Sequence, residues 1–319
     1  MPADPYLQED GATLRNKLGI SHDPAKLEAR ISALTALRIQ QIKAGRAQIE
    51  QTFDTAHLRA LHGFIFQDVF EWAGTFRGEK VCIEGHTAQL SGTMNKMGSR
   101  TSFAHASQIL PELQRTAGRI RKDNNLRGLS RDAFADKAAL VLTEINAAHP
   151  FREGNGRVQR VFMEQLAEQA GHKLDFTVVS QERMYRDSEA SMGSRHARPN
   201  PLMMQRLMRE IANPDRCAML KRVLTSLERS NVDWNDLYCM TAEPGNKYRG
   251  LFKGMPKGAE QFLIQADNAD LIVGRAADCP AGVATNDDVV FLASGPETTI
   301  APAHAKPRSG TKTGRDLSD

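Results

Sequence analysis

The sequence lacks the features that mark several classes of protein. Its 319 residues include four cysteines, none within a Cys-x-x-Cys spacing of another, which gives no support for a zinc or dithiol redox motif and suits a reducing compartment. No run of 18 apolar residues occurs, so no transmembrane helix is expected. Residues 1–6 have neither the basic start nor the apolar stretch of a Sec signal peptide. No internal repeat is present.

The charge balance is also modest. The formal net charge is +4, with 40% hydrophobic and 25% charged residues, a composition typical of soluble globular proteins. A charge this small does not require a nucleic-acid partner, and we expect neither nucleic acid nor membrane as a partner.

Apolar residues recur at three- and four-residue spacing over much of the chain, which predicts a mainly α-helical protein. Glycines at 74, 78, 85 and 92 interrupt this pattern around a short apolar run at 80–83, which predicts a hairpin. The expected helices cover residues 24–45, 54–71, 102–122, 131–148, 157–170, 181–193, 200–212 and 214–230.

The pattern changes after residue 237. Short apolar runs at 262–264, 271–273 and 289–292 alternate with glycines, which predicts a small all-β module over residues 238–294, here called the β module. We expect an N-terminal extension (1–22), a helical domain (23–212), a helical connector (213–237), the β module and a disordered tail (295–319).

Residues 149–160, which read HPFREGNGRVQR, lie between two predicted helices. Pro150 disfavours helix at His149, while Val158 and Phe162 begin the apolar face of the next helix. The segment Gly154-Asn155-Gly156 therefore lies at a helix N-terminus. Unpaired backbone N–H groups, the helix dipole and the two glycines all favour close approach of an anion there.

The side chains of this segment suit phosphate chemistry. Asn155 can add a donor, and Arg157 and Arg160 are spaced to grip phosphate oxygens from one side of the helix. Glu153 can bind Mg²⁺ when phosphates complete its coordination shell, and His149 can accept a proton from an attacking hydroxyl. Together they predict a phosphoryl- or nucleotidyl-transfer site.

Each feature alone has a simpler explanation. A His before Pro is commonly a helix cap, glycines between helices form turns, and paired arginines usually lie on a solvated face. A turn needs one glycine, however, and neither the His nor the carboxylate. Zinc binding by His149 and Glu153 would need a continuous helix, which Pro150 and Gly154 disfavour.

The segment resembles the signature of the Fic family, HxFx(D/E)GNGRxxR, at every fixed position. Residues 58–74, which read LRALHGFIFQDVFEWAG, resemble the helix that precedes the Fic active site, with its FQDV(Y/F)xWAG ending. The resemblance covers roughly residues 23–212. It implies an all-α Fic fold and, most often, protein AMPylation: transfer of AMP from Mg-ATP, the co-substrate, to a Ser, Thr or Tyr hydroxyl.

The resemblance also implies roles for the matching residues. His149 would be the catalytic base, and Glu153 would hold Mg²⁺, although Asp is the commoner residue there. ATP would be bound by Arg152, Gly154, Asn155, Gly156, Arg157 and Arg160. The glycine-rich stretch resembles the family's flap, which docks an extended target segment by strand pairing. The flap candidates are Arg77, Lys80, Val81 and Cys82, with an ordinary surface hairpin as the alternative.

Many Fic proteins carry an inhibitory helix with the pattern (S/T)xxxE(G/N). Only Glu79 follows a Ser or Thr by four residues, at Thr75, and Lys80 rather than Gly or Asn comes next. By resemblance, a separate small antitoxin-like protein would then inhibit the enzyme through Arg160.

The N-terminal segment and the β module resemble bacterial type IV secretion Fic effectors, which carry an OB-fold and then a delivery domain. This predicts an OB-like β module and a bacterial protein translocated into host cytosol; the delivery domain would be absent, or the chain a fragment. A Rho-family small GTPase is a possible target by the same resemblance.

Two alternatives remain open: transfer of another phosphate-containing group, and a binding module with an inactive Fic domain. A kinase-like relative would depart from the motif at Gly156, and an inactive one at His149 or Asn155; all three residues match.

Overall fold

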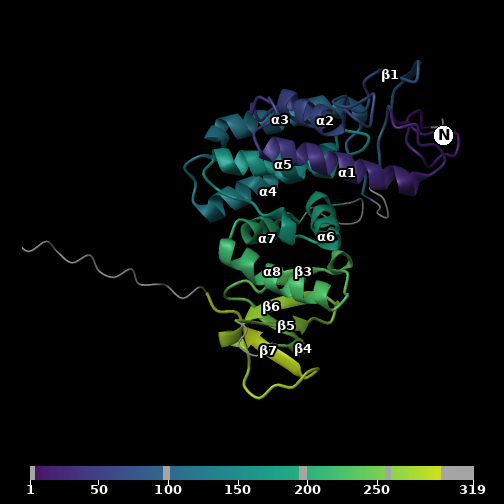
Figure 1. The fold of residues 1–319 in the computed structure, drawn as a ribbon. Coiled ribbons are helices and arrows are strands. Elements are labelled where there is room, and N and C mark those ends of the chain that lie inside the picture. The colour runs from purple at the N-terminus through teal and green to yellow at the C-terminus, as the bar shows by residue number, and fades with distance from the viewer. Residues whose placement is uncertain (1–3, 96–100, 194–199, 256–259, 296–319) are drawn as a thin grey trace, which may run out of the picture.

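A computed structural model of the chain describes residues 4–95, 101–193, 200–255 and 260–295. Figure 1 shows the helical part at one end, the β module at the other, and α7 and α8 between them. The helices are α1 (Pro24–Lys43), α2 (Thr55–Phe66), α3 (Ala106–Lys122), α4 (Arg131–Ala148), α5 (Asn155–Gln169), α6 (Gln181–Met192), α7 (Pro201–Ile211) and α8 (Pro214–Arg229).

Helix α4 is at the centre of the helical part. Its apolar stripe, which includes Phe134, Leu142 and Ile145, is at most 3% exposed. It packs against α3, α5, α6 and α7. Ser130 caps its N-terminus by accepting from the backbone N–H of Ala133. This packing fixes the C-terminal end of α4, where the motif begins.

The predicted mainly helical fold is confirmed, but α2 ends five residues earlier than the apolar pattern indicates. Phe66 is its last residue, and turns follow. Lys17 provides the reason: its backbone N–H donates to the Val69 carbonyl at 2.8 Å, and its ammonium donates to the Gln67 carbonyl at 2.7 Å. Phe70 and Trp72 then stack at 4.1 Å in the core. These tertiary contacts therefore occupy backbone carbonyls that would otherwise have accepted the hydrogen bonds of a longer helix.

A two-stranded antiparallel hairpin, β1 (Val81–Ile83) and β2 (His86–Ala88), lies where the glycine-rich stretch predicts one. Glu84 and Gly85, both with positive φ (51° and 80°), make its two-residue turn. Figure 1 places it at the edge of the helical part, beside the N-terminal segment.

The β module contains a five-stranded sheet in the order β3-β6-β5-β4-β7. Strands β4, β5 and β6 form an antiparallel meander; β7 adds antiparallel to β4, and β3 adds parallel to β6. The small all-β module is thus confirmed, while closure into an OB barrel stays a prediction. The strands are β3 (Cys239–Thr241), β4 (Lys247–Gly254), β5 (Gln261–Gln265), β6 (Leu271–Arg275) and β7 (Asp288–Leu292).

The hydrophobic core does not stop at the proposed domain boundaries. Cys239, Leu271 and Val273 of the β module belong to the same buried cluster as α4, α7 and α8, while the rest of the sheet has a second, smaller core. At the other end of the chain Tyr6, 1% exposed, packs edge-on against Trp72. The domain boundaries remain predictions, and nearly all of the expected disordered tail lies outside the described residues. Among the described helices, none is long and apolar enough to cross a membrane.

Candidate functional site

The first half of the motif lies on a short loop with a left-handed residue at each end. Helix α4 ends at Ala148 and is capped by His149, which has φ 44°, and Gly154, which has φ 84°, caps the start of α5. A β-carbon on Gly154 would overlap the Phe66 ring, so only glycine fits there. Helix α5 begins at Asn155, two residues earlier than the apolar pattern indicates, and its first N–H groups face the loop.

The Asn155 side chain closes this loop. Its Nδ2 donates to the Phe151 carbonyl at 2.7 Å, and its Oδ1 accepts from the Phe151 backbone N–H at 2.9 Å. Both functions of the amide therefore go to the loop backbone. Donors for an anion at this position would come from the backbone N–H groups at the start of α5, which the Asn155 side chain holds in place.

His62, on α2, supports the loop from below. Its Nδ1 accepts from the Gly74 backbone N–H at 2.7 Å, so the proton lies on Nε2, which donates to the Glu153 carbonyl at 3.0 Å. The ring stacks on Phe151 at 3.9 Å. Burial lowers the pKa of His62 to about 3, despite the opposing hydrogen bond to the Glu153 carbonyl, and so keeps the ring neutral.

Arg77 lies beneath the hairpin rather than on it. It is 1% exposed, and its guanidinium donates to the carbonyls of His149 (2.8 Å), Ala148 (3.1 Å), Gly92 (3.2 Å) and Ala104. Burial lowers the pKa of Arg77 to about 10, which leaves the group cationic at neutral pH. Its prediction as a docking residue of the flap is wrong, because a buried side chain cannot contact a docked segment. Arg77 instead positions the end of α4 that carries His149.

The other flap candidates do lie on the hairpin. Lys80 and Cys82 are exposed, and Val81 is half-buried. Val81 and Cys82 belong to β1, which pairs with β2 along one edge only among the described strands. The second edge of β1 can accept an extended segment by backbone pairing. These three residues therefore keep their predicted role as a proposal.

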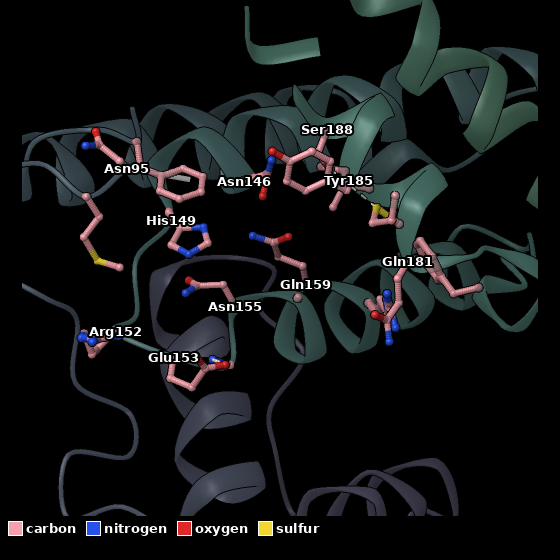
Figure 2. Close-up of a pocket in the computed structure, with 18 residues that line it drawn as sticks. Asn95, Asn146, His149, Arg152, Glu153, Asn155, Gln159, Gln181, Tyr185 and Ser188 are labelled. Atoms are coloured by element: carbon pink, nitrogen blue, oxygen red, sulfur yellow. Dashed lines mark hydrogen bonds between the residues drawn. The ribbon is translucent and has the colours of Figure 1, made fainter. Parts of the chain in front are cut away.

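His149 faces a pocket of about 430 Å³ that the motif, α5 and α6 enclose. Figure 2 shows its ring near Asn155 and Gln159, with Arg152 and Glu153 further along the loop and Gln181, Tyr185 and Ser188 on the opposite wall. Phe103 stacks on the imidazole with ring centroids 3.6 Å apart, which fixes the orientation of the ring. The volume is in the range of sites for cofactors and other small ligands.

The three motif arginines differ in placement. Arg160 lines the pocket, and burial lowers the pKa of its guanidinium. Arg152 also lines the pocket, but its Nε donates to Asp4 at 2.9 Å. Arg157 points toward α1, where its Nη2 meets Glu28 at 2.7 Å, and it does not line the pocket. Arg160 is therefore the motif arginine best placed to meet an anion in the pocket.

Glu153 has the placement of a magnesium ligand that needs other oxygens to complete the site. Its carboxylate lines the pocket, and one oxygen accepts from the Gly154 backbone N–H at 2.8 Å. Among the described residues, no three His, Cys, Asp or Glu side chains cluster as a metal site. A single hard carboxylate beside an anion site, here the backbone N–H groups at the start of α5, suits Mg²⁺ that arrives bound to a nucleotide. The residues present therefore fit Mg-ATP.

Several pocket residues lie outside the fixed positions of the motif and were not among the predicted site residues. The apolar pattern identifies the helices that carry most of them, α4, α5 and α6, but not which of their side chains face a pocket made by distant segments. They are Met94, Asn95, Phe103, Leu142, Asn146, Gln159, Phe176, Gln181, Met184, Tyr185 and Ser188.

Comparison with known proteins gives a consistent result. Residues 52–167 match the model of the Fic/DOC family. A protein adenylyltransferase from Bartonella henselae is 34% identical over 267 residues, which are 84% of this chain and 47% of the relative. The chain thus spans about half the length of this curated relative.

Solved structures agree with the fold. A type IV secretion system effector protein, BepA, matches 91% of this chain and 96% of its own with a TM-score of 0.79 and 32% identity. The N-terminal Fic domain of a VirB-translocated Bep effector from Bartonella quintana, solved with bound ADP, is 39% identical. It covers 66% of this chain and 94% of its own, with a TM-score of 0.60.

Proposed function

The chain belongs to the Fic/DOC family, and from that premise we propose that it transfers AMP from Mg-ATP to a hydroxyl group of a target protein. One observation carries the proposal: His149, the start of α5, Glu153 and Arg160 line a single pocket. His62 and Arg77, which lie outside that pocket, hold the backbone carbonyls of Glu153 and His149. The protein from Bartonella henselae bears the name of the same activity, and the Bartonella quintana domain binds ADP.

The reaction assigns a task to each group. The imidazole of His149 accepts the proton of a target hydroxyl as its oxygen bonds to the α-phosphorus of ATP. The bond between the α-phosphorus and the bridging oxygen breaks, and pyrophosphate leaves with that electron pair. Backbone N–H groups of Gly154, Asn155 and Gly156 stabilise the negative charge of the phosphates.

The motif side chains complete the nucleotide site. Arg160, and Arg157 after release from Glu28, bind the β- and γ-phosphates, while Arg152 borders them from the loop. Glu153 would hold Mg²⁺, which supplies charge neutralisation at the phosphates. The α6 residues opposite the motif would border the nucleoside.

The same proposal extends to partners. A Ser, Thr or Tyr of an extended target segment docks along β1 at Lys80, Val81 and Cys82, and a Rho-family small GTPase of a host cell is a candidate target. A separate antitoxin-like protein would inhibit by placing a carboxylate on Arg160. The resemblance to translocated effectors supports transfer from the bacterial cytoplasm into host cytosol.

The test is labelling in host-cell lysate with α-³²P-ATP and, separately, γ-³²P-ATP, using the wild type and His149→Ala with Mg²⁺. We expect a protein band labelled from the α-phosphate only, and its loss in the variant. A melting curve of His149→Ala that matches the wild type ensures that the loss is chemical. Label from the γ-phosphate would contradict AMP transfer and indicate a kinase-like reaction, and no label from either would favour another nucleotide donor or a binding module.

A further inference from the structure

Helix α6 has two functional faces. Gln181, Met184, Tyr185 and Ser188 recur at helical spacing and line the pocket that holds His149 (Figure 2). Arg183, Arg186 and Asp187 occupy the opposite face and point at the β module. The position of the pocket wall therefore depends on what holds this second face.

A buried ionic network joins α6 and α7 to strand β3. The Arg183 guanidinium pairs with Glu210 of α7 and donates to the Cys239 carbonyl at 3.0 Å. Glu210 also accepts from the Thr241 backbone N–H at 2.6 Å. Arg183 and Glu210 are at most 1% exposed. A buried charge that loses its partner is strongly destabilising, so α6 would have to move with any shift of β3.

Two side chains of the β module, Tyr238 and Asp270, also contact α6 directly. The Tyr238 hydroxyl donates to Asp187 Oδ1 at 2.8 Å, and Asp187 is fully buried. Arg186 donates to both oxygens of Asp270, at 2.6 and 3.3 Å, and lies over the Tyr238 ring at 4.2 Å. Tyr238 immediately precedes β3, and Asp270 immediately precedes β6. Strands β3 and β6 are parallel neighbours, so the residues just before them, Tyr238 and Asp270, both contact the same face of α6.

We propose that the β module sets the position of α6 and so the shape of the nucleotide pocket, with Tyr238 and Asp270 as positioning residues. Neither residue lines the pocket; both act through α6. The inference rests on the proposed function in one respect, that the pocket binds a nucleotide. In this proposal the β module contributes to the reaction by positioning α6 and does not itself bind a ligand.

The experiment compares the full chain with Tyr238→Phe, Asp270→Asn and the double variant. The Kd of Mg-ATP is measured by calorimetry with His149→Ala as background, so that no turnover is needed, and KM and kcat are measured with His149 intact. We expect a three- to ten-fold rise in Kd and KM for each single variant, a larger rise for the double variant, and kcat within two-fold. Asp270→Glu, which keeps the ion pair, is expected to restore binding.

Arg249→Gln is the matched control, because it removes an exposed ion pair with Asp288 between β4 and β7, at the edge of the sheet away from β3 and β6. It is expected to leave Kd unchanged, whereas hydrogen exchange over residues 181–192 accelerates only in the Tyr238 and Asp270 variants. A Kd that stays within two-fold of the wild type while melting temperature falls would overturn the proposal, as would an equal change in Arg249→Gln. ATP binding without AMP transfer would instead contradict the proposed function and leave this test intact, and a wild type that binds no nucleotide would overturn both.

Discussion

At the residue scale, the two motif glycines do different work. Gly154 has φ 84° and abuts Phe66, whereas a β-carbon on Gly156 would meet nothing within 4 Å. We predict that Gly154→Ala lowers the free energy of unfolding by about 2–4 kcal/mol through backbone strain and overlap. Gly156→Ala should fold normally, yet bind ATP at least ten-fold more weakly, because its methyl group fills the space in which a phosphate would approach the backbone N–H groups at the start of α5. Urea unfolding and calorimetry measure the two effects.

The pair serves as its own control. An unfolding curve of Gly154→Ala that matches the wild type would contradict the steric argument. Unchanged ATP affinity in Gly156→Ala would place the phosphates elsewhere in the pocket.

The motif arginines are also expected to differ. Arg160 lines the pocket, while Arg157 faces Glu28 outside it. We predict that Arg160→Ala lowers kcat/KM for ATP by about ten- to a hundred-fold, the value of one or two charge-assisted hydrogen bonds, and that Arg157→Ala lowers it less than five-fold. Steady-state AMP transfer at varied ATP concentrations measures both. The smaller effect is expected because Arg157 must break its ion pair with Glu28 before it can bind the phosphates. Equal losses would mean that breaking this pair costs nothing.

The residues of the motif could be predicted from sequence because their chemistry is local. His149, Glu153 and Arg160 fall within twelve consecutive residues, and the structure brings all three to one pocket. The residues that hold them could not be found in this way. His62 meets Glu153 from 91 positions away, and Arg77 meets His149 from 72. For an isolated His or Arg, the sequence does not indicate which distant backbone carbonyl the side chain will contact.

At the scale of elements, His62 holds α2 against the motif loop, and its burial has a consequence for acid stability. Its pKa is about 3 in the folded protein and ordinarily 6.5, so the unfolded chain takes up the proton first as pH falls. The stability contributed by the neutral ring is complete above pH 6.5 and is lost as pH falls toward 3. The loss is about 1.4 kcal/mol per pH unit.

We predict that His62→Gln is less stable than the wild type at pH 7 but loses less stability on acidification. Urea unfolding at pH 7, 6, 5 and 4 should give a slope smaller by about 1.4 kcal/mol per pH unit than that of the wild type. His86→Gln, on the exposed face of the hairpin, is the control and should retain the wild-type slope. Parallel curves for His62→Gln and the wild type would show that His62 does not titrate in this way.

The elements themselves were predicted well where their pattern is long. The eight helices and the hairpin lie where periodicity and glycines place them, and the errors are at the ends. Helix α2 stops early because Lys17, 50 positions before Gln67, takes a carbonyl of the expected helix. Helix α5 starts early because the Asn155 side chain fastens the loop before it. Both errors come from contacts that periodicity does not encode.

At the scale of the whole molecule, the order of strands in the β module was beyond prediction. Five short strands allow many arrangements, and the parallel pairing of β3 with β6 joins segments about 30 residues apart. That pairing also places Cys239, Leu271 and Val273 in the core of the helical part. A chain that divides by composition into two parts therefore has a main core that crosses the division.

This shared core predicts that the helical part and strand β3 unfold together. In Trp234→Phe the remaining tryptophan, Trp72, reports the helical core, where it is 1% exposed. Cys239 reports β3: it is buried, and burial raises its thiol pKa to about 12, so alkylation requires unfolding. We expect the urea midpoint of Trp72 fluorescence to coincide with that of Cys239 alkylation, read by mass spectrometry. Cys279, half-exposed in the second core, is the internal control and should label at lower urea. Alkylation of Cys239 before the fluorescence changes would mean that β3 separates from the helices first, and would weaken the case that the β module holds α6 in place.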